Sequence, residues 1–170
     1  LIYPGDYYAT REDCYISTIV GTCLAVCLFD FVSKLGGMIN FIIPGSVGTK
    51  GILGSDIVMA SITKMEYLMA DMVKLGGNRH YMKAKIFGAG YTGVSTVNNV
   101  TIPENNIRFV KEYFDLERIQ VEKMDIGGNN RRKLYLSVRD GTVYRKILVN
   151  NEENSEFIRL EEEYVQNEFL

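Results

Sequence analysis

The chain has 170 residues, 46% hydrophobic and 24% charged, which suits one globular domain with a sizeable buried core. A net charge of −2, with no run of Lys and Arg longer than the three residues Arg131–Lys133, predicts no basic face for nucleic acid. The longest apolar stretches, Leu24–Phe29 and Ile39–Pro44, are too short to span a bilayer, and no signal-peptide pattern opens the sequence. We therefore expect no nucleic-acid partner and no membrane insertion. Because the sequence begins at Leu1 rather than Met, we expect a few native residues to precede it.

The first half begins with two short, β-branched runs. Tyr15–Val20 and Leu24–Phe29 are predicted strands with a break at Gly21, and after a turn at Phe31–Leu35 the chain returns along Gly37–Ile43. Both strands of this hairpin are apolar on both faces. That pattern is typical of a sheet that other elements cover on each side.

A loop and a long helix follow the hairpin. Gly45–Gly54 holds four glycines, and we expect this loop to border the functional site. Ser55 is predicted to cap a helix that runs to about Leu75 and ends at Gly76-Gly77. The helix has a methionine-rich apolar stripe, which favours a core face over an adaptable binding surface; its residues are Val58, Ile62, Met65, Leu68, Met69, Met72 and Val73.

The middle of the chain predicts another strand and another helix. Met82–Phe87 alternates as a strand does. Thr101 and Glu104 have the spacing of a capping box, and Pro103 stands near the first turn, so a helix is predicted over Asn105–Asp115. Its core-facing residues are expected to be Ile107, Phe109, Val110, Tyr113 and Phe114.

The last part predicts three strands and a terminal helix. Ile119–Ile126 and Lys133–Val138 are strands, and a hairpin turn at Arg139–Gly141 leads into Val143–Val149. After a polar break, an acidic amphipathic helix is indicated by Phe157, Leu160, Tyr164 and Val165. The fold class is therefore α+β: a layered mixed sheet flanked by helices. We expect one domain over residues 1–150, with the helix of residues 151–170 packed on it or extending it.

The most informative segment is the elbow Gly21-Thr22-Cys23, which opens an apolar strand. Small residues there can lift a thiol into an accessible place beside backbone N–H groups, as a cysteine nucleophile requires. With the hairpin turn centred near Val32, Cys23 faces Asn40 on the returning strand, and directly opposed residues point to the same face. A slip of one residue would place the two side chains on opposite faces.

A series of short blocks runs through the chain in a fixed order. The blocks around the hairpin are Ser17-Thr18, Gly21-Thr22-Cys23, Asp30, Gly36-Gly37-Met38-Ile39-Asn40 and Pro44. The later blocks are Ala84–Ala89, Asn106–Phe109, Asp125–Gly128 with Arg132-Lys133, and Thr142–Lys146. Taken together, they resemble the chemoreceptor glutamine deamidases, the CheD family, over about residues 5–148. The family's cysteine-hydrolase scaffold is similar to that of bacterial toxin deamidases.

The resemblance implies deamidation of receptor glutamine to glutamate through a cysteine thioester, and hydrolysis of methyl-glutamate esters by the same route. In the family Cys is the nucleophile, His is the base and a Thr orients that His; the matching positions are Cys23, Asn40 and Ser17. Ser17 keeps the hydroxyl, but Asn40 removes the base, and loss of a positioned base typically costs about 10²–10⁴ in rate. The substitution fits either a natural variant with weakened catalysis or a change introduced to trap an inactive form.

Other residues of the elbow carry supporting roles in this interpretation. Gly21 and Thr18 support the site, and Thr22 either lends its hydroxyl or N–H to the oxyanion or simply forms the turn. Asp30 is expected to fix the hairpin turn.

The remaining candidates have plainer interpretations. Cys27 is expected to be a small buried residue, Cys14 a bystander thiol, and His80 an exposed surface residue. The three cysteines lack the spacing of a zinc site or a disulfide framework, so we expect reduced thiols in the cytoplasm, with no metal and no cofactor.

Two functions remain open at this point. One is a chemotaxis enzyme acting on the cytoplasmic domain of methyl-accepting chemoreceptors. The other is an adaptor with little chemistry that binds receptors or a CheC-like phosphatase. A different cysteine hydrolase on the same scaffold is a weaker third reading. The C-terminal helix lies outside the matched blocks, as either simple packing or a docking element.

Overall fold

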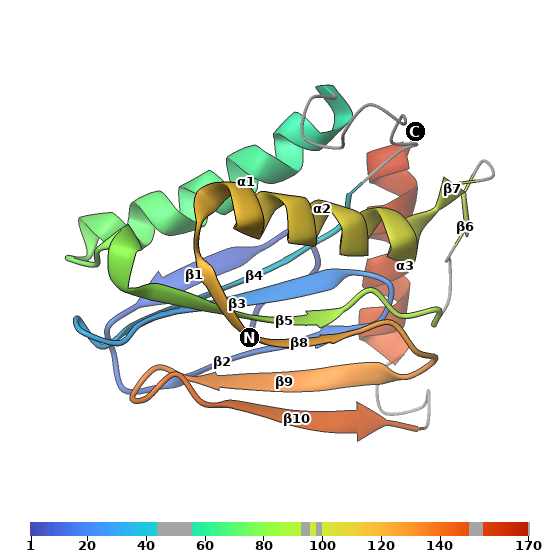
Figure 1. Cartoon of the computed structure of the whole chain (residues 1–170). Helices are drawn as coiled ribbons and strands as arrows, with labels where there is room; N and C mark the ends of the chain where they lie inside the picture. Colours follow the sequence, from blue (N-terminus) through green and yellow to red (C-terminus); the bar gives the residue numbers. More distant parts are fainter. Residues whose placement is uncertain (44–55, 93–95, 98–99, 150–154, 170) are drawn as a thin grey trace.

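The computed structural model describes residues 1–43, 56–92, 96–97, 100–149 and 155–169, and it stacks a helical layer on two β-sheets (Figure 1). The larger sheet has the order β1 (Tyr7–Thr10), β4 (Leu35–Phe41), β3 (Leu24–Asp30), β5 (Met82–Gly88) and β8 (Gln120–Ile126). The smaller sheet has the order β10 (Val143–Leu148), β9 (Arg131–Ser137) and β2 (Tyr15–Val20). Only β5 and β8 pair in parallel, so the larger sheet is mixed. The predicted layered α+β class is confirmed.

The hairpin strands β3 and β4 of the larger sheet are buried on both faces, as their apolar sequences predict. Side chains alternate along β3, so Leu24, Val26 and Leu28 pack on one face beneath α1 (Asp56–Lys74) and α2 (Ile102–Glu117). The intervening residues face the smaller sheet, where they meet its apolar side chains; they include Cys23, Ala25 and Cys27. Each face of β3 thus belongs to a different core.

The elbow is the point where the chain passes from one sheet to the other. Val20 ends β2, which pairs with β9 in the smaller sheet, and Leu24 begins β3, which pairs with β4 and β5 in the larger one. The three elbow residues therefore have no ladder partners of their own. Their backbone groups remain available for other contacts.

Several boundaries differ from the sequence predictions. β4 begins at Leu35, and Asn40 faces Ala25 rather than Cys23, a shift of two positions that keeps Cys23 and Asn40 on one face. α2 begins at Ile102, and Thr101 makes no side-chain capping bond. The Glu104 carboxylate accepts a hydrogen bond from the Tyr91 hydroxyl, so the predicted capping box is not formed. In α1, Val73 is 45% exposed and does not belong to the core stripe. The predicted cap Ser55 and the Gly45–Gly54 loop lie outside the described residues.

Short elements complete the chain. The end of α1 at Gly76-Gly77 is confirmed, since their N–H groups donate to the carbonyls of Val73 and Met72. The 3₁₀ turn η1 spans Arg79–Tyr81, and the small ribbon of β6 and β7 spans Thr96–Val97 and Val100–Thr101.

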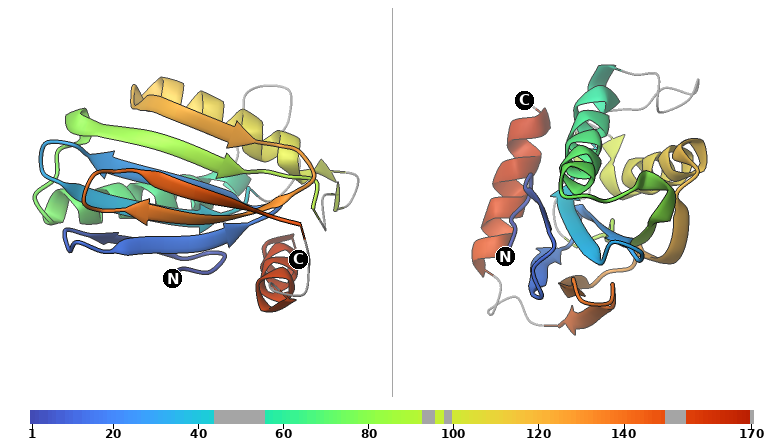
Figure 2. Two further views of the ribbon diagram at one scale, coloured as in Figure 1. Left: turned by 90° about the horizontal axis from the view of Figure 1, so that it is seen from below. Right: turned by 90° about the vertical axis from the view of Figure 1, so that its left-hand side faces the viewer.

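The terminal helix α3 (Ser155–Phe169) lies beside the N-terminal segment and α1 (Figure 2). Phe157 stacks on Tyr3 with ring centroids 5.0 Å apart, and the Tyr164 hydroxyl accepts a 2.9 Å hydrogen bond from Lys64 Nζ. The backbone of α3 does not pair with either sheet. Within the described residues, none of the helices is long and apolar enough to cross a membrane.

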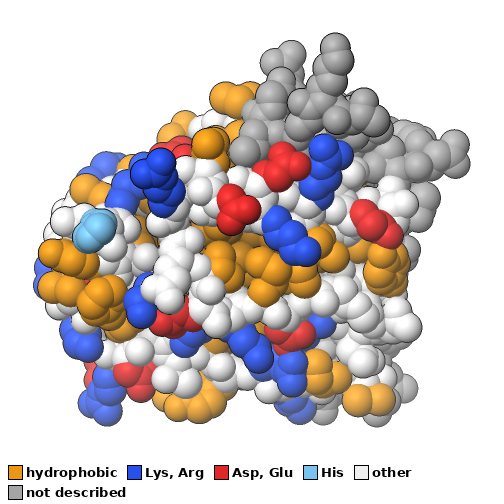
Figure 3. All heavy atoms as spheres, in the orientation of Figure 1, with side chains coloured by type: hydrophobic (Ala, Val, Ile, Leu, Met, Phe, Trp, Pro, Cys, Tyr) orange, Lys and Arg blue, Asp and Glu red, His pale blue; other side chains and the backbone are white. Residues whose placement is uncertain are grey.

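Lys and Arg side chains are interspersed with Asp and Glu on the face seen in Figure 3. A polyanion would therefore meet no continuous positive surface on that face.

Candidate active site

Backbone contacts from the end of β5 hold the elbow in place. The carbonyl oxygens of Cys23 and Gly21 accept hydrogen bonds of 2.8 Å from the N–H groups of Ala89 and Gly90. Gly88 has φ +109°, and a Cβ there would lie 2.2 Å from the Cys23 carbonyl oxygen. Only glycine permits this approach, so the sequence Gly88-Ala89-Gly90 acts as a clamp on the elbow.

A second layer supports this clamp. The Gly127 N–H donates to the Gly88 carbonyl at 2.9 Å, and the Gly127 carbonyl in turn accepts from Arg132 at 2.8 Å. Arg132 also pairs with Asp125 at 3.1 Å. The block Asp125–Gly128 with Arg132 therefore fixes the strand end that fixes the elbow.

The Cys23 thiol is fully buried, and two backbone N–H groups of the elbow converge on a single oxygen. Gly21 N and Cys23 N donate to Oε1 of Glu161 at 3.1 and 2.9 Å. Two converging N–H groups beside a nucleophile form the arrangement that stabilises an oxyanion during acyl transfer. In this structure a carboxylate of α3 occupies that position.

Glu161 is itself buried and has a cationic partner. It is 6% exposed, and its Oε2 lies 3.6 Å from the guanidinium of Arg131, which is 8% exposed. A buried carboxylate needs such a partner and such hydrogen bonds to offset the loss of hydration.

Asn40 points from β4 toward β2 and is fully buried. Its Nδ2 donates to Thr18 Oγ1 at 2.9 Å and to the Ile19 carbonyl at 3.1 Å, while its buried Oδ1 has no hydrogen-bond partner among the described residues. Because Asn40 faces Ala25, it is a diagonal neighbour of Cys23, typically about 7–8 Å away between Cα atoms. The direct opposition expected from the turn centre is wrong by two residues.

The hydroxyl that reaches position 40 belongs to Thr18. Thr18 Oγ1 accepts from Asn40 and donates to the Ile2 carbonyl at 2.9 Å. Ser17, which the family correspondence placed in this role, precedes Thr18 on β2 and therefore points to the opposite side of the strand.

Thr22 is held through its backbone. Its carbonyl accepts from Asn106 Nδ2 at 3.3 Å, and Asn106 Oδ1 accepts the Ile43 N–H at 2.7 Å, so one buried side chain of α2 ties the elbow to the end of the hairpin. The buried Thr22 hydroxyl has no hydrogen-bond partner in the part of the chain that the structure describes.

A sequence profile described as CheD chemotactic sensory transduction matches residues 55–147. Over 166 residues the chain is 37% identical to a Shewanella oneidensis protein named "Probable chemoreceptor glutamine deamidase CheD 1", which covers 96% of this chain and 78% of that protein. This chain belongs to the CheD family. The family assignment from the sequence blocks is confirmed.

Further CheD relatives are longer than this chain. Proteins of Burkholderia vietnamiensis and Paraburkholderia xenovorans, both named "Probable chemoreceptor glutamine deamidase CheD", are 36% and 34% identical over 149 residues. The alignments cover 86% of this chain but only 59% and 58% of those relatives. The matched profile starts after the elbow and ends before α3, so Cys23 and Glu161 both lie outside it.

The surroundings of the Cys23 thiol in this CheD chain disfavour its thiolate form. Burial, and after it the charge of Glu161 and a hydrogen bond to its carboxylate, raises the pKa of Cys23 well above its ordinary value. Cys27 is also buried, and this burial raises its pKa to about 12. The predicted buried role of Cys27 is confirmed.

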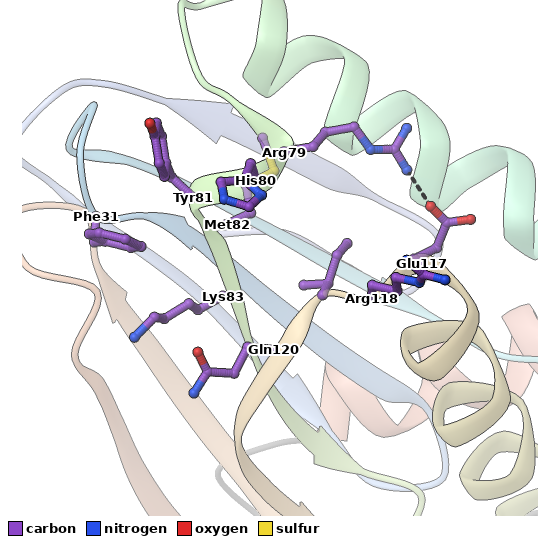
Figure 4. Close-up of a pocket in the computed structure, with 10 residues that line it drawn as sticks. Phe31, Arg79, His80, Tyr81, Met82, Lys83, Glu117, Arg118 and Gln120 are labelled. Carbon is purple, nitrogen blue, oxygen red and sulfur yellow. Dashed lines mark hydrogen bonds and ion pairs between the residues drawn. The ribbon is translucent and has the colours of Figure 1, made fainter.

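His80 takes no part in this site. It is exposed in η1, at the Met82 end of β5, whereas the clamp on Cys23 lies at the Gly88 end, a span of seven residues or about 20 Å. Figure 4 shows it with Phe31 and Lys83 at a surface hollow of about 500 Å³, beside the ion pair of Arg79 and Glu117. The surface assignment of His80 is confirmed.

The sequence patterns did not identify Glu161 and Arg131 as residues of the site. A signal for Glu161 was present: it lies four residues after Phe157 and four before Val165, so one acidic residue stands on the apolar stripe of α3. Such a charge needs a partner inside the protein. No comparable pattern singles out Arg131, since its contact depends on the packing of α3 against β9.

Proposed function

We propose that this chain is a protein-glutamine deamidase that acts on the cytoplasmic domain of chemoreceptors, with Cys23 as nucleophile. The observation that carries the proposal is the pair of elbow N–H groups, from Gly21 and Cys23, that converge on one oxygen beside the thiol. The names of the CheD relatives supply the substrate.

The proposed reaction has two steps. The Cys23 thiolate attacks the carboxamide carbon, the carbonyl oxygen becomes an oxyanion held by the elbow N–H groups, and the C–N bond breaks as ammonia leaves with the thiol's proton. Water then attacks the thioester, the C–S bond breaks, and glutamate and the free thiol are formed. A methyl-glutamate ester would follow the same route with methanol as the leaving group.

Position 40 sets the rate in this proposal. Asn40 cannot take a proton at neutral pH, and both of its N–H donors point to Thr18 and Ile19. Transfer of the thiol proton to the departing amide nitrogen therefore lacks a positioned base, which typically costs about 10²–10⁴ in rate. We propose that Thr18, rather than Ser17, orients the side chain at this position.

An adaptor function is the second candidate. Asn40 and the burial of Cys23, which raises the pKa of its thiol, favour a protein that binds a receptor or a CheC-like phosphatase in the cytoplasm with little chemistry. Binding of a receptor fragment that leaves every glutamine unconverted would support it.

Mass spectrometry of a receptor cytoplasmic fragment separates these functions. The fragment is incubated with the chain as it is, with Asn40→His and with Cys23→Ala. We expect slow conversion by the chain, conversion about 10²–10⁴ faster with Asn40→His, and none with Cys23→Ala. If Asn40→His converts no glutamine while the fragment still binds, the adaptor function is supported instead.

A further inference from the structure

Glu161 presents the chemical group that glutamine deamidation produces. Its carboxylate, at the end of two methylene groups, accepts both elbow N–H groups on Oε1 and faces Arg131 with Oε2. This is the place that the carbonyl oxygen of a glutamine side chain would take during attack by Cys23. A product glutamate would sit there in the same way.

Glu161 and a substrate cannot share the elbow. Cys23 has no exposed surface. A Cβ atom placed on Gly21 would lie 2.8 Å from Glu161 Oε2 and 2.3 Å from Thr92 Oγ1, so the space at the elbow is filled. With this packing, no second side chain can reach the N–H groups. Access to the thiol therefore requires Glu161 to leave.

We propose that α3 is an autoinhibitory element of this CheD chain, in which Glu161 occupies the position of the product side chain and excludes substrate. The proposal rests on the proposed function in taking Cys23 as the nucleophile. The negative charge of Glu161 beside the thiol acts in the same direction, because it disfavours the thiolate.

The construction of α3 suits a reversible block. Its backbone hydrogen bonds lie within the helix and it adds no strand to either sheet, so it can move away without breaking a ladder. Besides Glu161, its contacts with the described residues include those of Phe157 with Tyr3, Ile19 and Leu148, of Tyr164 with Lys64, and of the buried Val165. Side-chain contacts of this kind can be exchanged for those of a partner or substrate.

Glu161 as a replacement base is the opposing interpretation. A carboxylate that hydrogen-bonds the thiol could accept its proton, which would supply what Asn40 lacks. The two interpretations predict opposite effects of removing Glu161 on the reactivity of Cys23. Removal of Glu161 raises the reactivity of Cys23 if Glu161 blocks the elbow, and lowers it if Glu161 is the base.

Alkylation of the folded full-length chain by iodoacetamide tests the block without any deamidation. The rates at Cys23 and Cys27 are followed by peptide mass spectrometry in the chain, in Glu161→Ala and in the control Glu163→Gln, whose residue is exposed on the same helix. We expect Cys23 to react about tenfold or more faster in Glu161→Ala, with Cys27 and the control unchanged. An unchanged or slower Cys23 overturns the block, and so does an equal rise at Cys27, because general loosening would then explain it.

A second variant tests the position of the side chain. Glu161→Gln places a carboxamide on the elbow in the same molecule, so we expect Cys23 to convert it to glutamate, faster with Asn40→His added and not at all with Cys23→Ala. The conversion should not depend on protein concentration. If alkylation supports the block but the amide at position 161 persists in the Asn40→His background, the block stands and the deamidase function fails.

Discussion

Gly88 is the position at which an added side chain would most strongly disturb the elbow. Its φ of +109° and the 2.2 Å from its Cβ position to the Cys23 carbonyl oxygen are two separate constraints. Gly127 has only the backbone constraint, since its φ is +78° and none of the described residues lies within 4 Å of its Cβ position. Substitutions at the two positions therefore distinguish the cost of backbone strain from the cost of steric conflict.

We expect Gly88→Ala to destabilise the fold by more than Gly127→Ala does. The left-handed backbone alone costs about 1–2 kcal/mol for a residue with a Cβ, which is the full effect expected for Gly127→Ala. Gly88→Ala adds displacement of the Cys23 carbonyl and should exceed about 2 kcal/mol. Urea unfolding of both variants measures the difference, and equal losses would show that the elbow yields freely to the added methyl group.

At the scale of elements, local patterns predicted the strands and helices, but contacts between distant elements lay beyond them. Apolar runs and turn residues located β2, β3 and β5 within a residue or so, because those signals lie within each segment. The register of β3 on β4 depends on how many turn residues join the ladder, which the sequence pattern does not reveal. The turn centre therefore predicts Cys23 as the partner of Asn40, whereas the partner in the structure is Ala25. The packing of α3 on the elbow has no local signal except the acidic residue on its apolar stripe.

The contact between α2 and the elbow predicts a stability effect at Asn106. Asn106→Ala leaves the Thr22 carbonyl and the Ile43 N–H buried without their partner, each at about 1–3 kcal/mol, so we expect a loss of about 2–6 kcal/mol. Lys111→Ala on the exposed side of α2 is the matched control and should change stability by less than about 0.5 kcal/mol. Urea unfolding gives both values, and similar small losses would mean that water replaces the Asn106 amide.

At the scale of the whole molecule, the two ends of the larger sheet differ in their construction. The elbow end brings together a buried thiol, a buried carboxylate and polar atoms without partners, including Thr22 Oγ1 and Asn40 Oδ1. At the opposite end, one carboxylate joins the hairpin turn to the segment after α1: Asp30 accepts N–H groups of Val32 and Ser33 at 2.9 Å and of Asn78 at 2.8 Å. The predicted role of Asp30 in the turn is confirmed and extends to the segment after α1.

Asp30 should make the stability of this far end depend on acid. Burial alone would raise the pKa of Asp30, but the N–H donors of Ser33, Asn78 and Val32 outweigh it and hold the pKa below its ordinary value. A carboxyl with a lowered folded pKa contributes stability above its unfolded pKa, about 3.9, and loses it as the pH falls through the folded value. We therefore expect the free energy of unfolding to decrease as the pH falls below about 4, and to decrease less steeply in Asp30→Asn.

Urea unfolding of both proteins between about pH 3 and 7 isolates the contribution of Asp30 by difference. The other carboxyls with lowered pKa values, Asp71, Asp125 and Asp140, steepen both curves alike. Parallel curves would show that Asp30 binds its N–H partners no better ionised than protonated.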